Sequence, residues 1–219
     1  KQMKIDNNLR SIIDNIPKKV TLVAVSKTKP VELIKNAYDC GQRDFGENKV
    51  QEMALKAEAM PKDIRWHMIG HVQTNKIKYM APFVHMVHGV DREKVLRELD
   101  KHAKKVDRTI NCLLQVHIAQ EETKFGWSIA ELEEVLPTLS VYSNIKVCGL
   151  MGMASNTDNK DQIGKEFSGL SNFYNAHAQK QGWNTLSIGM SGDYTIAMAH
   201  GATHVRIGSS IFGARTYTP

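Results

Sequence analysis

A lysine at the end of an apolar run is the first residue that could carry covalent chemistry. The run Leu22–Val25 predicts a buried strand, and Lys27 lies at its end. Side chains alternate along a strand, so Lys27 would share a face with Val23 and Val25. Burial lowers the pKa of an amine and thereby frees it to attack a carbonyl carbon. The alternative is a lysine whose stem follows apolar surface while its ammonium reaches water.

Small residues near the C-terminus could bind an anion. Gly208 would let the backbone approach an anion closely, and Ser209 adds a hydroxyl and an N–H donor. Ser191 follows an apolar run that ends at Met190, and it is expected both to cap the next helix and to donate to an anion. Each residue taken singly fits an ordinary turn. Two such turns at consecutive strand ends favour a phosphate cradle.

A reactive amine beside a phosphate cradle is the arrangement that a pyridoxal 5'-phosphate (PLP) site needs. Lys27 would supply the nitrogen of the Schiff base. Arg206 would then face the pyridine nitrogen and keep it unprotonated, which makes the ring a weaker electron sink. The alternative for Arg206 is a structural ion pair with a neighbouring carboxylate such as Glu47. Asn48 could bond the phenolic oxygen of the cofactor or cap the helix that follows it.

Strand-like and helical stretches alternate along the whole chain. The expected strands are Leu22–Val25, Asp44–Gly46, Trp66–Gly70, Phe83–Val90, Ile110–Ile118, Ile145–Met153, Thr185–Met190 and His204–Phe212. The expected helices are Val31–Cys40, Asn48–Met60, Thr74–Met80, Arg92–Lys105, Ile129–Leu139 and Gln162–Gln181, with an extra helix at Asp6–Ile16. Pro30 suits a first helical turn, Asp91 and Ser128 suit N-caps, and Gly182 suits a helix end.

Strict alternation of apolar strands with helices implies parallel strands joined by helical crossovers. Eight such units in 219 residues predict a (β/α)8 TIM barrel in a single domain, 1–219. An open doubly wound sheet would need a glycine-rich phosphate loop after its first strand, and Ser26–Pro30 has none. Because barrel sites lie at the C-terminal ends of the strands, the candidate residues, His67 and Met151 among them, are expected at that rim.

Metal and nucleophile chemistry find little support in the sequence. His67, His71, His85 and His88 are candidate ligands, but no HExxH motif or carboxylate-flanked arrangement accompanies them. We therefore expect no metal site. The sequence also lacks a Gly-x-Ser-x-Gly elbow and a recognisable cysteine nucleophile.

The amino-acid composition indicates the cellular compartment of the protein and limits the classes of partner it could bind. The three cysteines Cys40, Cys112 and Cys148 are widely spaced and odd in number, which favours a reducing cytoplasm. No apolar run approaches the roughly 20 residues of a membrane span, and the first residues lack a signal core. The net charge of +6 invites a nucleic-acid hypothesis. Lysines mixed with acidic residues, as in 91–100, argue against it.

Several motifs together resemble the pyridoxal phosphate homeostasis protein family. They occupy residues 24–30, 45–52, 66–76, 149–151, 186–191 and 205–215. The resemblance covers nearly the full chain, and the block around His67 is distinctive.

The resemblance implies a barrel like the N-terminal domain of alanine racemase, with PLP held on Lys27. By resemblance, Ser191, Gly208 and Ser209 hold the phosphate, Arg206 faces the pyridine nitrogen, and Asn48 lines the site. Met190, beside Ser191, completes the expected cofactor-binding set.

The resemblance also implies a role in intracellular PLP supply and amino-acid balance, without established catalytic turnover. We therefore expect a carrier, with PLP-dependent apo-enzymes as its recipients. A weak amino-acid racemase is the alternative, but a barrel uses up the chain and leaves no additional β-domain to deliver a second base such as Tyr194 or Tyr217. The same consideration favours a monomer.

Overall fold

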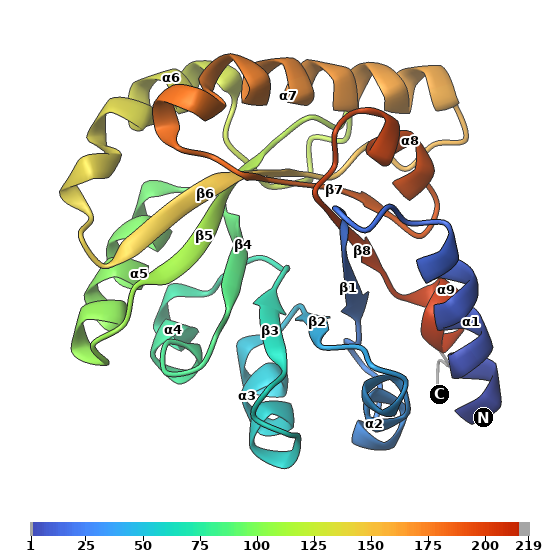
Figure 1. Ribbon diagram of the computed structural model, residues 1–219. Coiled ribbons are helices and arrows are strands. Elements are labelled where there is room, and N and C mark those ends of the chain that lie inside the picture. The colour runs from blue at the N-terminus through green and yellow to red at the C-terminus, as the bar shows by residue number, and fades with distance from the viewer. Residues whose placement is uncertain (1, 215–219) are drawn as a thin grey trace.

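The computed structural model describes residues 2–214, with side chains from residue 4 onward. Eight parallel strands close into a barrel in the order β1 to β8, and helices surround it (Figure 1). The predicted (β/α)8 barrel is therefore confirmed. The strands are β1 (Thr21–Val25), β2 (Asp44–Glu47), β3 (Arg65–Met68), β4 (Met86–Val90), β5 (Ile110–Val116), β6 (Ile145–Gly152), β7 (Thr185–Met190) and β8 (His204–Ile207).

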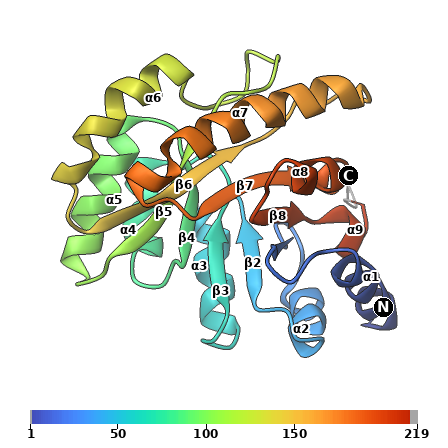
Figure 2. The same ribbon diagram turned by 45° about the horizontal axis from the view of Figure 1, so that its top comes forward.

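Helices connect consecutive strands, and α1 precedes the first strand. The helices are α1 (Gln2–Asp14), α2 (Val31–Asp39), α3 (Val50–Ala59), η1 (Thr74–Lys76), α4 (Ile77–Met80), α5 (Glu93–Lys105), α6 (Ile129–Val135), η2 (Leu136–Val141), α7 (Lys160–Gln181), α8 (Tyr194–Ala199) and α9 (Ser209–Phe212). The α1 helix lies beside α9, where Asn8 Nδ2 donates to Ile211 O at 2.9 Å (Figure 2). No described helix has the length and apolar character that crossing a membrane requires.

The barrel closes between its first and last strands. Thr21 is in register with His204, and Ala24 is in register with both Ile207 and Phe45. All neighbouring strands are parallel, so their C-terminal ends share one rim. The loops at that rim are the ones that build sites in this fold.

The interior of the barrel is divided between apolar and polar side chains. His88 on β4 bonds Ser187 on β7, and because these strands are not neighbours, that bond crosses the interior. A small buried cluster consists of Met86, Leu113, Cys148 and Met151. Met86 lies two residues before His88 and so faces the interior with it. The larger apolar cluster packs the helices onto the barrel strands.

The strands other than β7 differ from their predicted bounds by at least one residue, and β8 differs most. The eighth strand ends at Ile207, and the stretch expected to continue it to Phe212 forms α9 instead. An apolar pair such as Ile211 and Phe212 fits a buried strand or a short helix equally well, so the pattern could not decide. The first strand ends at Val25 as expected, but Lys27 lies in the turn that follows and so does not share a strand face with Val23 and Val25.

Helix boundaries mostly follow their sequence signals. Ser128 forms a capping box with Glu131, and Gly182 ends α7 in the left-handed conformation at φ 70°. The prediction for Asp91 is wrong, because Arg92 is the N-cap of α5. The Asp91 carboxylate instead bonds His71 Nδ1 at 2.9 Å and an Arg92 terminal nitrogen at 2.6 Å. These side-chain partners occupy the oxygens that a cap would use.

Candidate cofactor site

A cavity of about 500 Å³ lies at the C-terminal rim of the barrel. It falls within the range of about 300–1,000 Å³ that is usual for small-molecule sites. All seven residues of the expected cofactor-binding set line it, namely Lys27, Asn48, Met190, Ser191, Arg206, Gly208 and Ser209. Strand ends far apart in the sequence therefore meet at one cavity.

Lys27 is partly buried in a turn that is fixed on both sides. On one side, Ser26 Oγ donates to Glu47 Oε1 at 2.9 Å. On the other side, the Thr28 N–H donates to Glu52 Oε1 at 2.6 Å. Thr28 adopts a left-handed conformation with φ 64°, which is uncommon for a residue other than glycine. The neighbouring contacts thus hold the backbone that carries the lysine at the cavity.

Arg206 is a buried cation whose protein partners are neutral. Its NH1 donates to Ser187 Oγ, and its NH2 donates to Gly152 O at 3.1 Å. Burial lowers the pKa of Arg206 to about 10, which still leaves it protonated at neutral pH. The alternative ion pair with Glu47 is wrong, because Glu47 Oε1 lies 2.5 Å from Lys56 Nζ. A buried guanidinium at the edge of a cavity can donate a further hydrogen bond, and an acceptor atom on a ligand could receive it.

Two turns of small residues meet at the cavity. The Gly208 N–H donates to Ser191 Oγ at 3.3 Å, which joins the ends of β7 and β8. Ser209 opens α9, so its N–H has no acceptor within that helix. The prediction that Ser191 caps the next helix is wrong, since Asp193 is the N-cap of α8 and its Oδ1 accepts from the Met190 N–H at 2.7 Å.

The space at these turns depends on glycine. A Cβ at Gly208 would lie 3.2 Å from Val25 Cβ and 3.2 Å from Val25 O, tighter than most real contacts. A Cβ at Gly192 would meet nothing within 4 Å. Gly208 therefore lets two backbone segments approach each other beside the cavity, whereas Gly192 does not.

The remaining predicted residue and several unexpected ones complete the lining. Asn48 lines the cavity, and the alternative that it caps α3 is wrong, because Lys49 is the N-cap. His71 and Phe125 line it as well, with stacked rings whose centroids are 3.9 Å apart. His71 stood out only as one of several histidines, and nothing in the sequence singled out Phe125, which reaches the cavity from a loop.

His67 lies inside the barrel and does not line the cavity. It is fully buried, with Nε2 at 2.9 Å from Asp44 Oδ1. Asp44 opens β2, so this contact lies toward the N-terminal end of the strands. The expected position of His67 at the rim is wrong. Met151 is likewise buried in the interior cluster and does not line the cavity.

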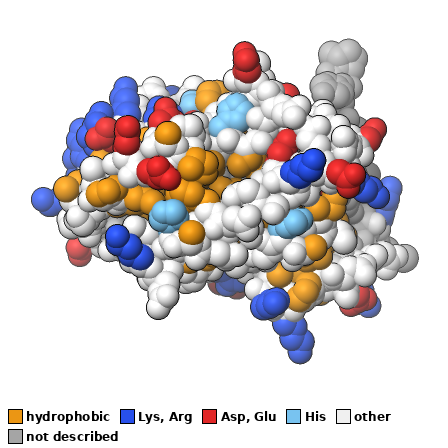
Figure 3. All heavy atoms as spheres, turned by 90° about the horizontal axis from the view of Figure 1, so that it is seen from above, with side chains coloured by type: hydrophobic (Ala, Val, Ile, Leu, Met, Phe, Trp, Pro, Cys, Tyr) orange, Lys and Arg blue, Asp and Glu red, His pale blue; other side chains and the backbone are white. Residues whose placement is uncertain are grey.

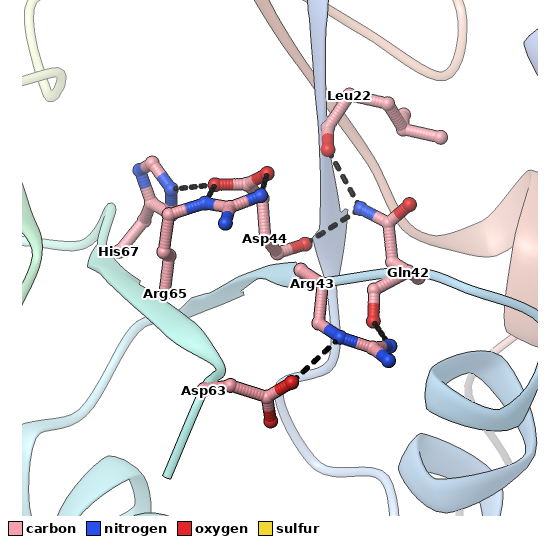
Figure 4. A network of polar contacts seen from close by, with 7 residues as sticks. All are labelled: Leu22, Gln42, Arg43, Asp44, Asp63, Arg65 and His67. Atoms are coloured by element: carbon pink, nitrogen blue, oxygen red, sulfur yellow. Dashed lines mark hydrogen bonds and ion pairs between the residues drawn. The ribbon is translucent and has the colours of Figure 1, made fainter.

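One group of described residues has potential metal-ligand atoms within 4.8 Å of one another: Asp44, His67 and His85. Its carboxylate is already engaged, because Arg65 Nε and NH2 donate to Asp44 Oδ1 and Oδ2 at 2.9 and 2.8 Å (Figure 4). A guanidinium in this position satisfies the negative charge that a cation would need. Hydrogen bonding therefore accounts for this cluster.

The charges of the cavity favour an anion. Of the described residues that line it, Lys27, Lys29 and Arg206 are basic, and none is acidic. The structure thus places an amine, a buried guanidinium and a pair of small-residue turns around one space. This donor set fits a phosphorylated aldehyde with an aromatic ring nitrogen.

Comparison with known proteins first defines the class. Residues 2–216 match the family model for the N-terminal domain of alanine racemase. An alanine racemase from Bartonella henselae, whose structure contains covalently bound pyridoxal phosphate, superimposes with a TM-score of 0.75 at 16% identity. That match covers 100% of this chain and 62% of the racemase, and at such low identity it speaks for the fold alone.

More similar proteins narrow the class to one family. A pyridoxal phosphate homeostasis protein of Vibrio alginolyticus is 41% identical, over 92% of this chain and 89% of its own. One from Synechocystis is 38% identical, over 93% of this chain and 95% of its own. PipY of Synechococcus elongatus without PLP has a TM-score of 0.91 at 34% identity, covering 95% of this chain and 100% of PipY, and PipY was also solved with PLP bound. The chain belongs to the pyridoxal phosphate homeostasis protein family.

Proposed function

We propose that this chain binds pyridoxal 5'-phosphate as a Schiff base on Lys27 and acts in intracellular PLP homeostasis, PLP supply and amino-acid balance. One observation carries the proposal: Lys27, Arg206 and the turns at Ser191 and Gly208 surround a single cavity that has no acidic residue among its described lining. The PLP bound to PipY, a relative at 34% identity, supports the same ligand. We also propose that residues 1–219 act as one cofactor-binding domain.

The residues divide the work of holding the cofactor. The Lys27 amine would condense with the PLP aldehyde, forming a C=N bond and releasing one water. Ser191, Gly208 and Ser209 would donate to the phosphate. Arg206 would face the pyridine nitrogen, and Asn48 would line the same site beside the ring. Because a guanidinium keeps that nitrogen unprotonated, the ring would be a weak electron sink, which suits storage better than carbanion chemistry.

A matched pair of lysine variants tests the anchor. Lys29 also lines the cavity, but its Nζ donates to Gly213 O and Ala214 O, each at 3.3 Å. After mixing with PLP, the native protein and Lys29→Ala should show an imine absorbance band near the visible edge, and Lys27→Ala should not. A band of equal strength in Lys27→Ala would show that another amine is the anchor.

A weak amino-acid racemase is the alternative function, and it needs a second group that moves protons. Apart from the basic side chains, the titratable described residue that lines the cavity is His71, whose Nδ1 lies 2.9 Å from Asp91 Oδ2. Tyr194 is not among the lining residues, and Tyr217, like Arg215, lies outside the described residues. We expect no loss of optical activity when single-enantiomer amino acids are incubated with the PLP-loaded protein. A loss that disappears in His71→Asn would overturn the carrier proposal.

We further propose that the protein is a cytoplasmic monomer that hands PLP to apo-enzymes. Cys40, Cys112 and Cys148 are free thiols, which suits a reducing compartment. The large exposed apolar side chains are spread over different elements, which supports a monomer. On the face shown in Figure 3, lysine and arginine side chains stand in separate groups with acidic side chains among them, which disfavours a nucleic-acid partner. Light scattering tests the monomer, and reactivation of a PLP-free enzyme by the loaded protein tests the handover.

A further inference from the structure

A continuous series of hydrogen bonds runs through the barrel interior and ends on Arg206. We call its members the interior relay: Asp44, His67, His88 and Ser187. From one end to the other, the contacts are Asp44 Oδ1 to His67 Nε2 at 2.9 Å, His67 Nδ1 to His88 Nε2 at 2.8 Å, His88 Nδ1 to Ser187 Oγ at 2.9 Å, and Ser187 Oγ to Arg206 NH1.

The relay links two ends of the barrel. Asp44 opens β2 and is held by the exposed Arg65 (Figure 4). Arg206 lines the cavity at the opposite rim. The intervening His67, His88 and Ser187 are completely buried. His67 and His88 lie on the neighbouring strands β3 and β4, and the contact from His88 to Ser187 on β7 carries the relay across the interior.

The two ends fix the direction of the outermost hydrogen bonds of the relay. Although burial alone would raise it, the pKa of Asp44 is lowered by hydrogen bonds from His67 and Arg65, so Asp44 is an ionised acceptor. His67 must therefore carry its proton on Nε2. At the other end, Arg206 can only donate, so the Ser187 oxygen is an acceptor and its own hydroxyl proton is available to the relay.

One neutral arrangement satisfies every atom between these ends. Ser187 donates its hydroxyl proton to His88 Nδ1, and His88 donates its Nε2 proton to His67 Nδ1. Both histidines are then neutral Nε2–H tautomers. In the other arrangement, a cationic His67 would donate to His88, and His88 would donate to Ser187. Ser187 Oγ would then accept hydrogen bonds from both Arg206 and His88. Its own hydroxyl proton would have no acceptor within the relay, because His88 Nδ1 would carry a proton.

We infer that the interior relay is a positioning device for Arg206. Its hydrogen bonds all point the same way, from the guanidinium toward the Asp44 carboxylate, so each bond polarises the next and strengthens the acceptor at Ser187. Ser187 and Gly152 O together hold both terminal nitrogens of Arg206, and turning the guanidinium away from the cavity would break both contacts. A buried cation is thereby supported by a distant carboxylate, without an ion pair that would cover it.

The consequence for the cofactor rests on the proposed function. Arg206 would face the pyridine nitrogen, so its orientation sets the absorbance of bound PLP and part of its affinity. The residues of the relay do not line the cavity. They act through Arg206, and Ser187 is the member whose loss disconnects it.

The direction of the relay can be measured without cofactor. Long-range proton–nitrogen NMR correlations distinguish the two neutral histidine tautomers and the imidazolium. In the native protein at neutral pH, His67 and His88 should both be neutral with the proton on Nε2. An imidazolium at His67, or a proton on Nδ1 of either ring, would overturn the assigned direction even if every relay variant failed to fold.

A matched pair of variants on β7 tests the positioning role. Ser187→Ala removes the hydroxyl that joins His88 to Arg206. Thr185→Val removes another buried hydroxyl from the same strand, one that donates to Asn184 Oδ1 at 2.8 Å and lies outside the relay. Ser187→Ala should shift the imidazole nitrogen resonances of both His88 and His67, change the absorbance of bound PLP and weaken its affinity roughly tenfold. Thr185→Val should leave all three readouts as in the native protein.

The outcomes separate this inference from the proposed function. If the native protein binds no PLP, the proposed function fails, while the tautomers still report on the relay. If PLP binds but Ser187→Ala leaves its absorbance and affinity unchanged, the positioning role is wrong and the proposed function stands. If Ser187→Ala shifts the imidazole nitrogen resonances of His88 but not those of His67, the relay is not continuous.

Discussion

Lys56 and Glu47 form a buried ion pair directly beneath the turn that carries Lys27. Lys56 Nζ lies 2.5 Å from Glu47 Oε1 and also donates to Ser26 O at 2.8 Å and to Glu52 Oε1 at 3.0 Å. Glu47 and Glu52 are the acids that hold the residues on either side of Lys27. One ammonium group from α3 therefore organises the backbone around the proposed anchor.

Removing this ammonium should destabilise the fold. Lys56→Met leaves a buried carboxylate without its charge partner, which typically costs about 3–5 kcal/mol of the free energy of unfolding. Urea unfolding measures the change. Lys35→Met is the control, because its pair with Asp39 is exposed and should contribute no more than about 1 kcal/mol. Equal losses in the two variants would contradict the role of the buried pair.

The phosphate role of the small-residue turns can be tested with two glycines. Gly208→Ala places a Cβ against Val25 and disturbs the approach of β8 to the cavity, so PLP affinity should fall roughly tenfold. Gly192→Ala meets open space and should stay within about twofold of the native affinity. Titration with pyridoxal, which lacks the phosphate, should show a smaller difference between the two variants. An equal penalty for both ligands would assign Gly208 a purely structural role.

A lowered histidine pKa makes stability depend on pH. Burial lowers the pKa of His204 to about 4, whereas the unfolded chain titrates near 6.5. As the pH falls from 6.5 toward 4, the unfolded state binds the proton first, so the stability that His204 contributes is present above 6.5 and is lost below it. Between pH 7.5 and 5.0 this loss should amount to about 2 kcal/mol.

The contribution of His204 to the pH dependence of stability is obtained by comparing the native protein with a variant that lacks this imidazole. His204→Asn keeps a polar group near Thr203 Oγ1, which lies 2.9 Å from His204 Nδ1, but it cannot titrate. Urea unfolding of the native protein should therefore lose about 2 kcal/mol more than the variant between pH 7.5 and 5.0. Parallel pH dependence in the two proteins would show that His204 does not titrate as its burial implies.

The sequence was sufficient for the barrel and for the seven residues expected to bind the cofactor, all of which line the cavity, because both depend on local patterns. Alternation of apolar runs with helices ordered the strands, and small residues or charges at strand ends marked Lys27, Ser191 and Arg206. The exact residues at which strands and helices end were harder to predict from the sequence. The apolar pair Ile211 and Phe212 fits either a strand or the helix that it forms.

The interior relay could not be predicted, because it depends on which side chains face each other across a closed barrel. His67 and His88 lie on the paired strands β3 and β4, but only the closure of the sheet brings Ser187 on β7 to His88. In the sequence, His67 was one of several histidines, and its position suggested the rim. The contact of His71 with Phe125 could not be predicted either, because Phe125 reaches the cavity from a loop that carries no sequence signal.

The most direct test of the central claim is to trap the cofactor on the protein. PLP is added, the C=N bond is reduced with borohydride, and the modified peptide is mapped by mass spectrometry. The modification should fall on Lys27 alone, although Lys29 lines the same cavity. A label on Lys29 in place of Lys27, or one spread evenly over surface lysines, would contradict the claim.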